Sequence, residues 1–143
     1  MTIRDLRLRE AKPSDRPHIL LWDTPNDLEL RQLAYLENAE CISYRTHLLK
    51  RIAGQNSSFL ALHLRLDREL NSIKTICRET NKPLVILQDL DRLITYMCVQ
   101  PESPITLFWQ NLFNTRHLER ILWILLPNKL APPNWDESRI QRI

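Results

Sequence analysis

The sequence predicts an α/β fold, a three-layer sandwich whose middle layer is a mostly parallel sheet of about four or five strands. Short apolar runs such as LVIL at 84–87 contain no polar residue, as is typical of strands buried on both faces of a sheet. Helical patterns lie between these runs, and this alternation indicates strand–helix–strand units. The 143 residues, 43% of them hydrophobic, suffice for one core and are too few for two ordinary domains.

The α/β domain is predicted over residues 18–143, and residues 1–17 are predicted to be a charged N-terminal arm that packs loosely. Strands are predicted where apolar runs are bounded by turn-forming residues, at 18–22, 40–44, 84–87 and 120–126. Helices are predicted where apolar residues recur with helical spacing, at 27–38, 45–53, 58–80 and 106–114.

Several residues mark the expected ends of these helices. Thr24 or Asn26 can cap the first helix, and Gly54 can end the second. One helical turn is expected at 93–97, and a short helix capped by Asn134 is expected in the tail. Because ligands of parallel α/β folds bind beyond the carboxyl ends of the strands, the polar residues at those ends are the first candidates for a site.

The composition limits the chemistry that the chain can perform. A net charge of +3 and a pI of about 8.9 are mildly basic, which is too weak a signal to indicate nucleic-acid binding by itself. Gly54 is the only glycine. Phosphate-binding loops need glycines, because their backbone N–H groups must approach the phosphate closely. The composition therefore argues against a working phosphate-binding loop.

We expect no metal, cofactor, disulfide or membrane segment. The three cysteines are widely spaced, which fits free thiols in a reducing cytoplasm. The four histidines lack the spacing of metal ligands. No run approaches the ~20 apolar residues that span a bilayer, and the charged N-terminus lacks the apolar region of a secretory signal. These features predict a cytoplasmic protein.

The segment HILLWDTPNDLEL, at 18–30, resembles the strand, loop and first helix of a P-loop ATPase of the AAA type. In that family an apolar strand leads into the phosphate-binding motif G-P-P-G-x-G-K-T. Residues 23–30 read DTPNDLEL, in which Pro25 matches a proline of the motif and every glycine is missing. Glu29 stands where the phosphate-binding lysine belongs, and Leu30 where the magnesium-binding hydroxyl belongs.

Two later strands resemble the same family. LVILQDLDRL, at 84–93, is similar to the Walker B strand, with Gln88 in place of the magnesium-associated aspartate. Asp89 then matches the catalytic glutamate and Asp91 the acid after it, while Asn128 ends a strand similar to the sensor strand. The resemblance covers residues from about 18 to 130. It implies a degenerate nucleotide site at Asp23, Thr24, Pro25, Glu29, Gln88, Asp89, Asp91 and Asn128.

Both halves of such a site would work poorly. Glu29 in place of a lysine replaces attraction by repulsion, a difference of several kcal/mol across ~4 Å at an effective dielectric of about 20. Neutral Gln88 would bind Mg²⁺ less well than a carboxylate. We therefore expect no ATP hydrolysis. The alternative reading of Asp89 and Asp91 is an ordinary solvated turn after a strand, and Asn128 after a proline also fits a turn.

Within this class, the chain resembles the small P-loop protein of BREX phage-defence loci, through LVILQDLDRL, PITLFWQNLFN and RILWILLPN. The resemblance implies a cytoplasmic accessory protein that works beside a larger ATPase and other complex members. We therefore expect a non-catalytic subunit that mediates or regulates protein–protein contacts in a phage-defence or DNA-transaction complex. Its partners would be other protein subunits, and an oligomer is compatible with this role.

Other functions stay open. The chain could be a small DNA-binding adaptor that uses basic residues of the helices at 45–53 and 58–80, or a weak nucleotide-binding protein. Acids among those basic residues, at Asp67, Glu69 and Glu79, favour an ordinary solvated face. An enzyme using the acids at 89 and 91 would need a further base or metal ligand. The residues expected to contact a partner or DNA are Arg65, Arg68, Arg116, Arg120 and Trp135.

Overall fold

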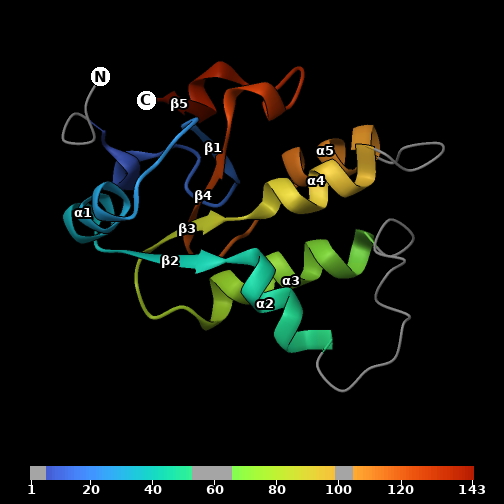
Figure 1. Cartoon of the computed structure of the whole chain (residues 1–143), viewed down its shortest axis with the longest axis horizontal. Helices are drawn as coiled ribbons and strands as arrows, with labels where there is room; N and C mark the ends of the chain where they lie inside the picture. The colour runs from blue at the N-terminus through green and yellow to red at the C-terminus, as the bar shows by residue number, and fades with distance from the viewer. Residues whose placement is uncertain (1–5, 53–65, 99–104) are drawn as a thin grey trace.

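A computed structural model describes residues 6–52, 66–98 and 105–143. Five parallel strands form one sheet in the order β2-β3-β4-β1-β5 (Figure 1). The strands are β1 (His18–Leu21), β2 (Ala39–Ser43), β3 (Leu84–Gln88), β4 (Ile121–Leu126) and β5 (Ile140–Arg142). The predicted α/β class and its parallel sheet are therefore confirmed.

Helices flank this sheet. They are α1 (Asp27–Glu37), α2 (Tyr44–Ile52), α3 (Leu66–Glu79), α4 (Leu90–Cys98) and α5 (Ile105–Phe113). Three short 3₁₀ segments are η2 (Leu8–Glu10), η4 (Asn128–Leu130) and η5 (Glu137–Arg139). Figure 1 shows α1 set apart from α2, α3, α4 and α5, which gather at the other end of the view. Within the described ranges, no helix has the length and apolar character needed to cross a membrane.

The three central strands, β3, β4 and β1, bury both faces, and the alternation of their side chains divides the core in two. In β4, Leu122, Ile124 and Leu126 face one cluster, which is built with α3, α4 and α5. Trp123 and Leu125 face the other cluster, which is built with α1 and the N-terminal segment. This two-sided burial explains why the strands are continuous apolar runs in the sequence.

The N-terminal segment is not the loosely packed arm that we expected. Leu6 and Leu8 are 1% and 0% exposed and belong to the core cluster under α1. The Trp123 indole nitrogen donates a hydrogen bond to the Leu8 carbonyl oxygen at 3.0 Å. Helix α1 covers only part of this face of the sheet, and Leu6 and Leu8 cover another part of it. Burying each contributes roughly 1.5–3 kcal/mol.

Three helical predictions need correction or lie partly outside the described residues. The single turn expected at 93–97 is wrong, because α4 is a full helix that starts at Leu90, directly after β3. Of the helix expected at 58–80, α3 covers the part from Leu66, and residues 58–65 lie outside the described ranges. Asn134 does not cap a helix; Asp136 accepts from the Ser138 backbone N–H at 3.0 Å and caps η5. The chain then forms β5 beside β1.

Candidate functional site at the carboxyl edge of the sheet

The strand order brings the predicted nucleotide-site residues to one edge of the sheet. β4 lies between β1 and β3, so the carboxyl ends of these three parallel strands are neighbours. The Trp22 N–H donates to the Leu126 carbonyl at 2.9 Å, which extends the pairing of β1 and β4 beyond the strands. The loops that follow β1, β3 and β4 therefore start side by side, as a shared site would require.

The loops after β1 and β4 are joined directly. Asp23, at the end of β1, accepts a hydrogen bond at 2.7 Å from the backbone N–H of Asn128, where η4 begins. The carboxylate thus satisfies a backbone donor that the short η4 helix leaves unpaired. Asn128 takes part in this contact through its backbone, and the residue is exposed to solvent. The structure therefore brings Asp23 and Asn128 together, in a contact that fastens two loops.

The N-terminus of α1 is closed by its own side chains. Asn26 accepts from the Glu29 backbone N–H at 2.7 Å, and its amide nitrogen donates to the Glu29 carboxylate at 2.6 Å. Asp27 and Glu29 both lie in the first turn. A helix N-terminus attracts anions through free N–H groups and its dipole, and here one such N–H is occupied and two carboxylates already match the dipole. Thr24 is exposed and Pro25 half-buried in the loop before this cap.

The ends of β2 and β3 form a second pair. Ser43 and Gln88 are register partners, and the Ser43 hydroxyl donates to an Asp89 carboxylate oxygen at 2.5 Å. Asp89 has a left-handed backbone (φ 69°), which aspartate tolerates better than most residues, and this lets β3 pass to α4 through one residue. Because β2 lies on the side of β3 away from β1, the Asp89 carboxylate points away from the loop that follows β1. Asp91 is half-buried in the first turn of α4.

A buried polar pair beside this edge was missed by the sequence reasoning. The Tyr44 hydroxyl, at the start of α2, donates to a carboxylate oxygen of Glu69 on α3. Tyr44 is 1% exposed and Glu69 0% exposed. The expectation that Glu69 lies on a solvated face is therefore wrong. A signal for its burial was present in the sequence. Ile73 and Ile76 follow Glu69 by four and seven residues, a helical spacing that puts all three on the inner face of α3.

Of the four arginines expected to contact a partner, the three that the structure describes do not join this site. Arg120 precedes β4 at the opposite edge of the sheet, where it donates to the Thr80 and Glu119 carbonyl oxygens at 3.0 and 2.7 Å. It stabilises the start of the strand. Arg116 is exposed near the same edge, and Arg68 is half-buried on α3. Arg65 lies outside the described residues.

Trp135 is a core residue and does not project from the tail as expected. It is 6% exposed, and its ring lies 6.0 Å from that of Trp109 and 5.1 Å from that of Phe113, both on α5. The Arg139 guanidinium lies over the Trp135 ring at 4.9 Å, a cation–π contact. The reason is that β5 pairs with β1 and pulls the preceding residues onto α5.

The described residues hold no cluster of metal ligands, and the buried thiol of Cys77 is unreactive, whereas Cys98 is exposed and Cys41 half-buried. Within the described part of the chain, no group of three or more His, Cys, Asp or Glu side chains is placed to hold a metal. Cys77 is fully buried, and burial raises the pKa of its thiol to about 12, which keeps it protonated and unreactive at neutral pH. The remaining chemistry at the edge is that of Asp23, Asp89 and Asp91.

Comparison with known proteins assigns no family to the chain. No protein-family model matches it, and a search of curated proteins finds no significant match. What this edge of the sheet does must therefore be argued from its own contacts. Those contacts pair β1 with β4 through Asp23 and Asn128, and β2 with β3 through Ser43 and Asp89.

Proposed function

We propose that the chain is a non-catalytic, P-loop-like accessory or regulatory subunit that works through protein–protein contacts beside an active ATPase. One observation carries the proposal: the N-terminus of α1, where a phosphate-binding loop would lead, is capped by Asn26 and Glu29. Nucleotide phosphates would meet Asp27 and Glu29 there, two carboxylates in place of the lysine that P-loops use.

The strand order supports the P-loop-like part of this proposal. A nucleotide site of this kind needs the phosphate loop after one strand and the magnesium-binding acid after another, with their ends close together. β4, the strand similar to a sensor strand, is the only strand between β1 and β3 in the described sheet. The positions that the AAA resemblance assigns to one site are therefore neighbours, although their chemistry has changed.

The direction of Asp89 supports the non-catalytic part. A catalytic carboxylate must reach the water that attacks the γ-phosphate, which would lie near the loop after β1. Asp89 instead accepts from Ser43 on the β2 side. Its neighbour Gln88 carries no charge for a magnesium ion. Each half of the site has thus lost its chemistry, while the sheet that supported it remains.

A nucleotide titration tests this proposal directly. We expect isothermal titration of the full chain with ATP and Mg²⁺ to give no saturable heat, and an assay of phosphate release to show no turnover. The same titration with Glu29→Lys checks that one restored cation does not rebuild the site, because the glycines are still absent. Binding of the wild-type chain in the micromolar range, or measurable turnover, would contradict the proposal.

The cellular setting of the proposal is a phage-defence or DNA-transaction complex, and it rests on the resemblance to the small P-loop protein of BREX loci. The genes beside its own provide the test. We expect a large ATPase and a methyltransferase to be encoded there, and we expect the tagged chain to co-purify with that ATPase. A neighbourhood without either gene, together with no co-purification, would remove the defence setting.

A DNA-binding adaptor is the second candidate, because three basic side chains line one hollow at the amino edge of the sheet. Lys74 and Arg78 of α3 and His117 line a hollow of about 460 Å³, which one acid, Glu119, also lines. A gel shift with duplex DNA at ~50 mM salt tests it, since phosphate contacts weaken steeply with salt. Binding that is lost in Lys74→Glu and kept in Lys129→Glu, at the other edge, would favour this candidate; no binding would exclude it.

A further inference from the structure

A groove lies between the N-terminal segment and the second half of α1, far along the helix from its capped N-terminus. Its volume is about 960 Å³. Its exposed lining comes from two elements. The N-terminal segment contributes Arg7, Arg9 and Glu10, and α1 contributes Arg31, Gln32, Tyr35 and Leu36. We call this the α1 groove. It is separate from the strand ends of the candidate site.

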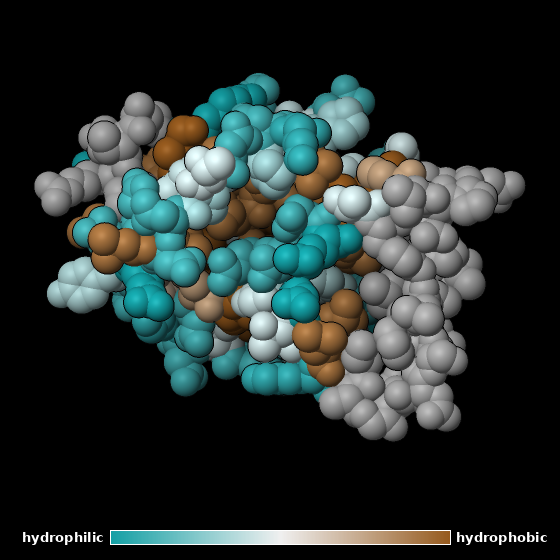
Figure 2. Space-filling view, in the orientation of Figure 1, coloured by the Kyte–Doolittle hydropathy of each residue, from teal (hydrophilic) through white to brown (hydrophobic). Residues whose placement is uncertain are grey.

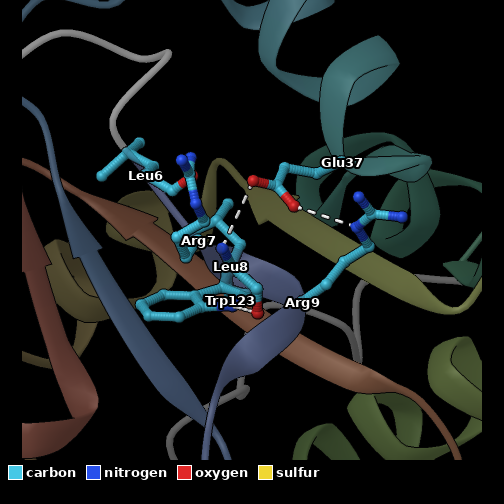
Figure 3. A network of polar contacts seen from close by, with 6 residues as sticks. All are labelled: Leu6, Arg7, Leu8, Arg9, Glu37 and Trp123. Carbon is cyan, nitrogen blue, oxygen red and sulfur yellow. Dashed lines mark hydrogen bonds and ion pairs between the residues drawn. The ribbon is translucent and has the colours of Figure 1, made fainter.

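The floor of the α1 groove is held rigidly by a buried carboxylate (Figure 3). Glu37, at the end of α1, accepts from the Leu8 backbone N–H at 3.4 Å and from the Arg9 guanidinium at 3.3 Å. Its side chain is 8% exposed. The Leu8 carbonyl in turn accepts from Trp123 of the central strand. The N-terminal wall is thus tied to α1 and to the sheet, so the groove exists before any partner arrives.

The solvent-facing side of α1 exposes three large hydrophobic residues, of which Tyr35 and Leu36 line the α1 groove and Leu28 lies outside it. Leu28, Tyr35 and Leu36 are 67%, 86% and 48% exposed. They are spaced by seven and eight residues, so they lie along one face of α1, opposite the buried Leu30 and Leu33. Figure 2 shows hydrophobic residues reaching the surface on the side of the molecule where α1 lies. An apolar stripe with a polar border is typical of a protein-binding surface.

Cations border this stripe. Three exposed arginines line the α1 groove against one exposed acid, Glu10, because Glu37 is buried beneath Arg9. Arg31 has no hydrogen-bond or ion-pair partner within the described ranges. Arginine and tyrosine are the residues most enriched at protein-binding hot spots, and arginine pairs with carboxylates in a two-pronged geometry. The rim therefore selects a partner that carries acids beside its apolar residues.

We propose that the α1 groove is the docking site for an amphipathic helix of a partner protein, with an apolar stripe flanked by Asp or Glu residues. The inference rests on the proposed accessory function and names the chemistry of its partner. A helix fits because recognition in a groove by apolar anchors at helical spacing needs no free strand edge. A second copy of the chain fits poorly, since a two-fold contact here would set arginines against arginines.

A peptide selection tests the proposal without knowledge of the partner. A display library of peptides of roughly 20 residues, long enough to form a helix, is selected on the full chain and then on Tyr35→Ala and Arg31→Glu. We expect the selected peptides to share an apolar stripe flanked by acids. A synthetic peptide from the selection should bind Tyr35→Ala and Arg31→Glu at least about tenfold more weakly, as hot-spot substitutions do.

Matched controls keep this test specific. Leu107→Ala on α5 removes an exposed leucine elsewhere and should leave peptide affinity unchanged. Exchanging the peptide's acids for lysines should abolish binding. Peptides that bind Tyr35→Ala and Arg31→Glu as well as the wild type, or that carry no acids, would overturn the proposal. Sedimentation showing a dimer that Tyr35→Ala dissociates would also overturn it, in favour of a second copy.

The selection and the nucleotide titration can fail independently. Micromolar ATP binding would contradict the accessory function while a positive selection still stood. No enrichment at the α1 groove, in a chain that binds no ATP and still co-purifies with an ATPase, would keep the accessory function and place its docking surface elsewhere.

Discussion

The two ends of α1 differ in what they leave unsatisfied. At its N-terminus, Asn26 and Glu29 bind each other, and neighbouring loops are joined through Asp23. From its middle onward, Arg31 and Tyr35 face solvent beside the α1 groove. The N-terminal end, where the proposed resemblance would place a phosphate site, is capped by its own side chains, and the remainder of the helix exposes Tyr35 and Arg31. The difference teaches that one helix can be closed by its own caps at one end and still expose a hydrophobic and cationic surface along the rest of its length.

The largest loss of stability should come from removing a buried leucine of the N-terminal segment that borders the α1 groove. Leu8→Ala deletes a fully buried side chain, and we expect the free energy of unfolding to fall by about 2–5 kcal/mol in urea denaturation. Leu107→Ala, at a 55% exposed position on α5, is the control and should change it by less than about 0.5 kcal/mol. Equal, small effects of both substitutions would show that the N-terminal segment does not hold the groove.

At the carboxyl edge, a buried hydroxyl should matter where an exposed one does not. Tyr44→Phe deprives the buried Glu69 of a hydrogen bond, which should lower the free energy of unfolding by about 1–3 kcal/mol. Tyr35→Phe removes the same atom from a residue that is 86% exposed, and the change should stay within about 0.5 kcal/mol. If both substitutions lower the free energy of unfolding by the same amount, the buried hydroxyl of Tyr44 contributes no more to stability than the exposed hydroxyl of Tyr35.

The cap of α1 should contribute stability and nothing to nucleotide binding. Asn26→Ala removes the acceptor of the Glu29 N–H, and the expected loss is about 1 kcal/mol by thermal or urea unfolding. Asn128→Ala is a matched control, because Asn128 is held through its backbone, and its effect should be near zero. A gain of ATP affinity in Asn26→Ala would mean that the cap hides a working phosphate site.

The smallest change in stability should come from lowering the pH. The ring nitrogen Nε2 of His18 must donate to the Pro13 carbonyl, 2.8 Å away, so the buried neutral ring ties the N-terminal segment to β1. Burial first, and then the charge of Arg139, lower the pKa of His18 below 6.5 against the opposing effect of that hydrogen bond. The unfolded chain therefore binds the proton first, and stability should fall as pH drops below about 6.5, until it passes the lowered pKa.

Unfolding measured from about pH 8 to pH 5 checks this, since histidine titrates in that range. The free energy of unfolding should depend less steeply on pH in His18→Gln than in the wild type over this range, because the substitution removes the group whose pKa is lowered by folding. A wild-type chain that gains stability as the pH falls through this range would contradict the assignment of a buried neutral ring.

Much of the fold could be read from local pattern. β1, β3 and β4 were predicted within about a residue, because strands buried on both faces are nearly continuous apolar runs. β5 could not be read, since Ile140–Arg142 holds one apolar residue and becomes a strand only by pairing with β1. The burial of Glu69 was predicted wrongly for a related reason. A charged residue is assigned to the solvent-exposed surface unless its partner is known, and the partner Tyr44 is 25 residues away in the sequence.

The sequence by itself determined the α/β class, the presence of a single glycine, and the acids at 23, 89 and 91 that follow its strands. Only the tertiary structure decided where those acids point, that Leu6 and Leu8 close one face of the sheet, and that Tyr35 and Arg31 stand open beside them. The physical reason is range. Strand and helix patterns arise from neighbours along the chain, whereas a carboxylate's partner and a groove's walls come from segments that only folding brings together.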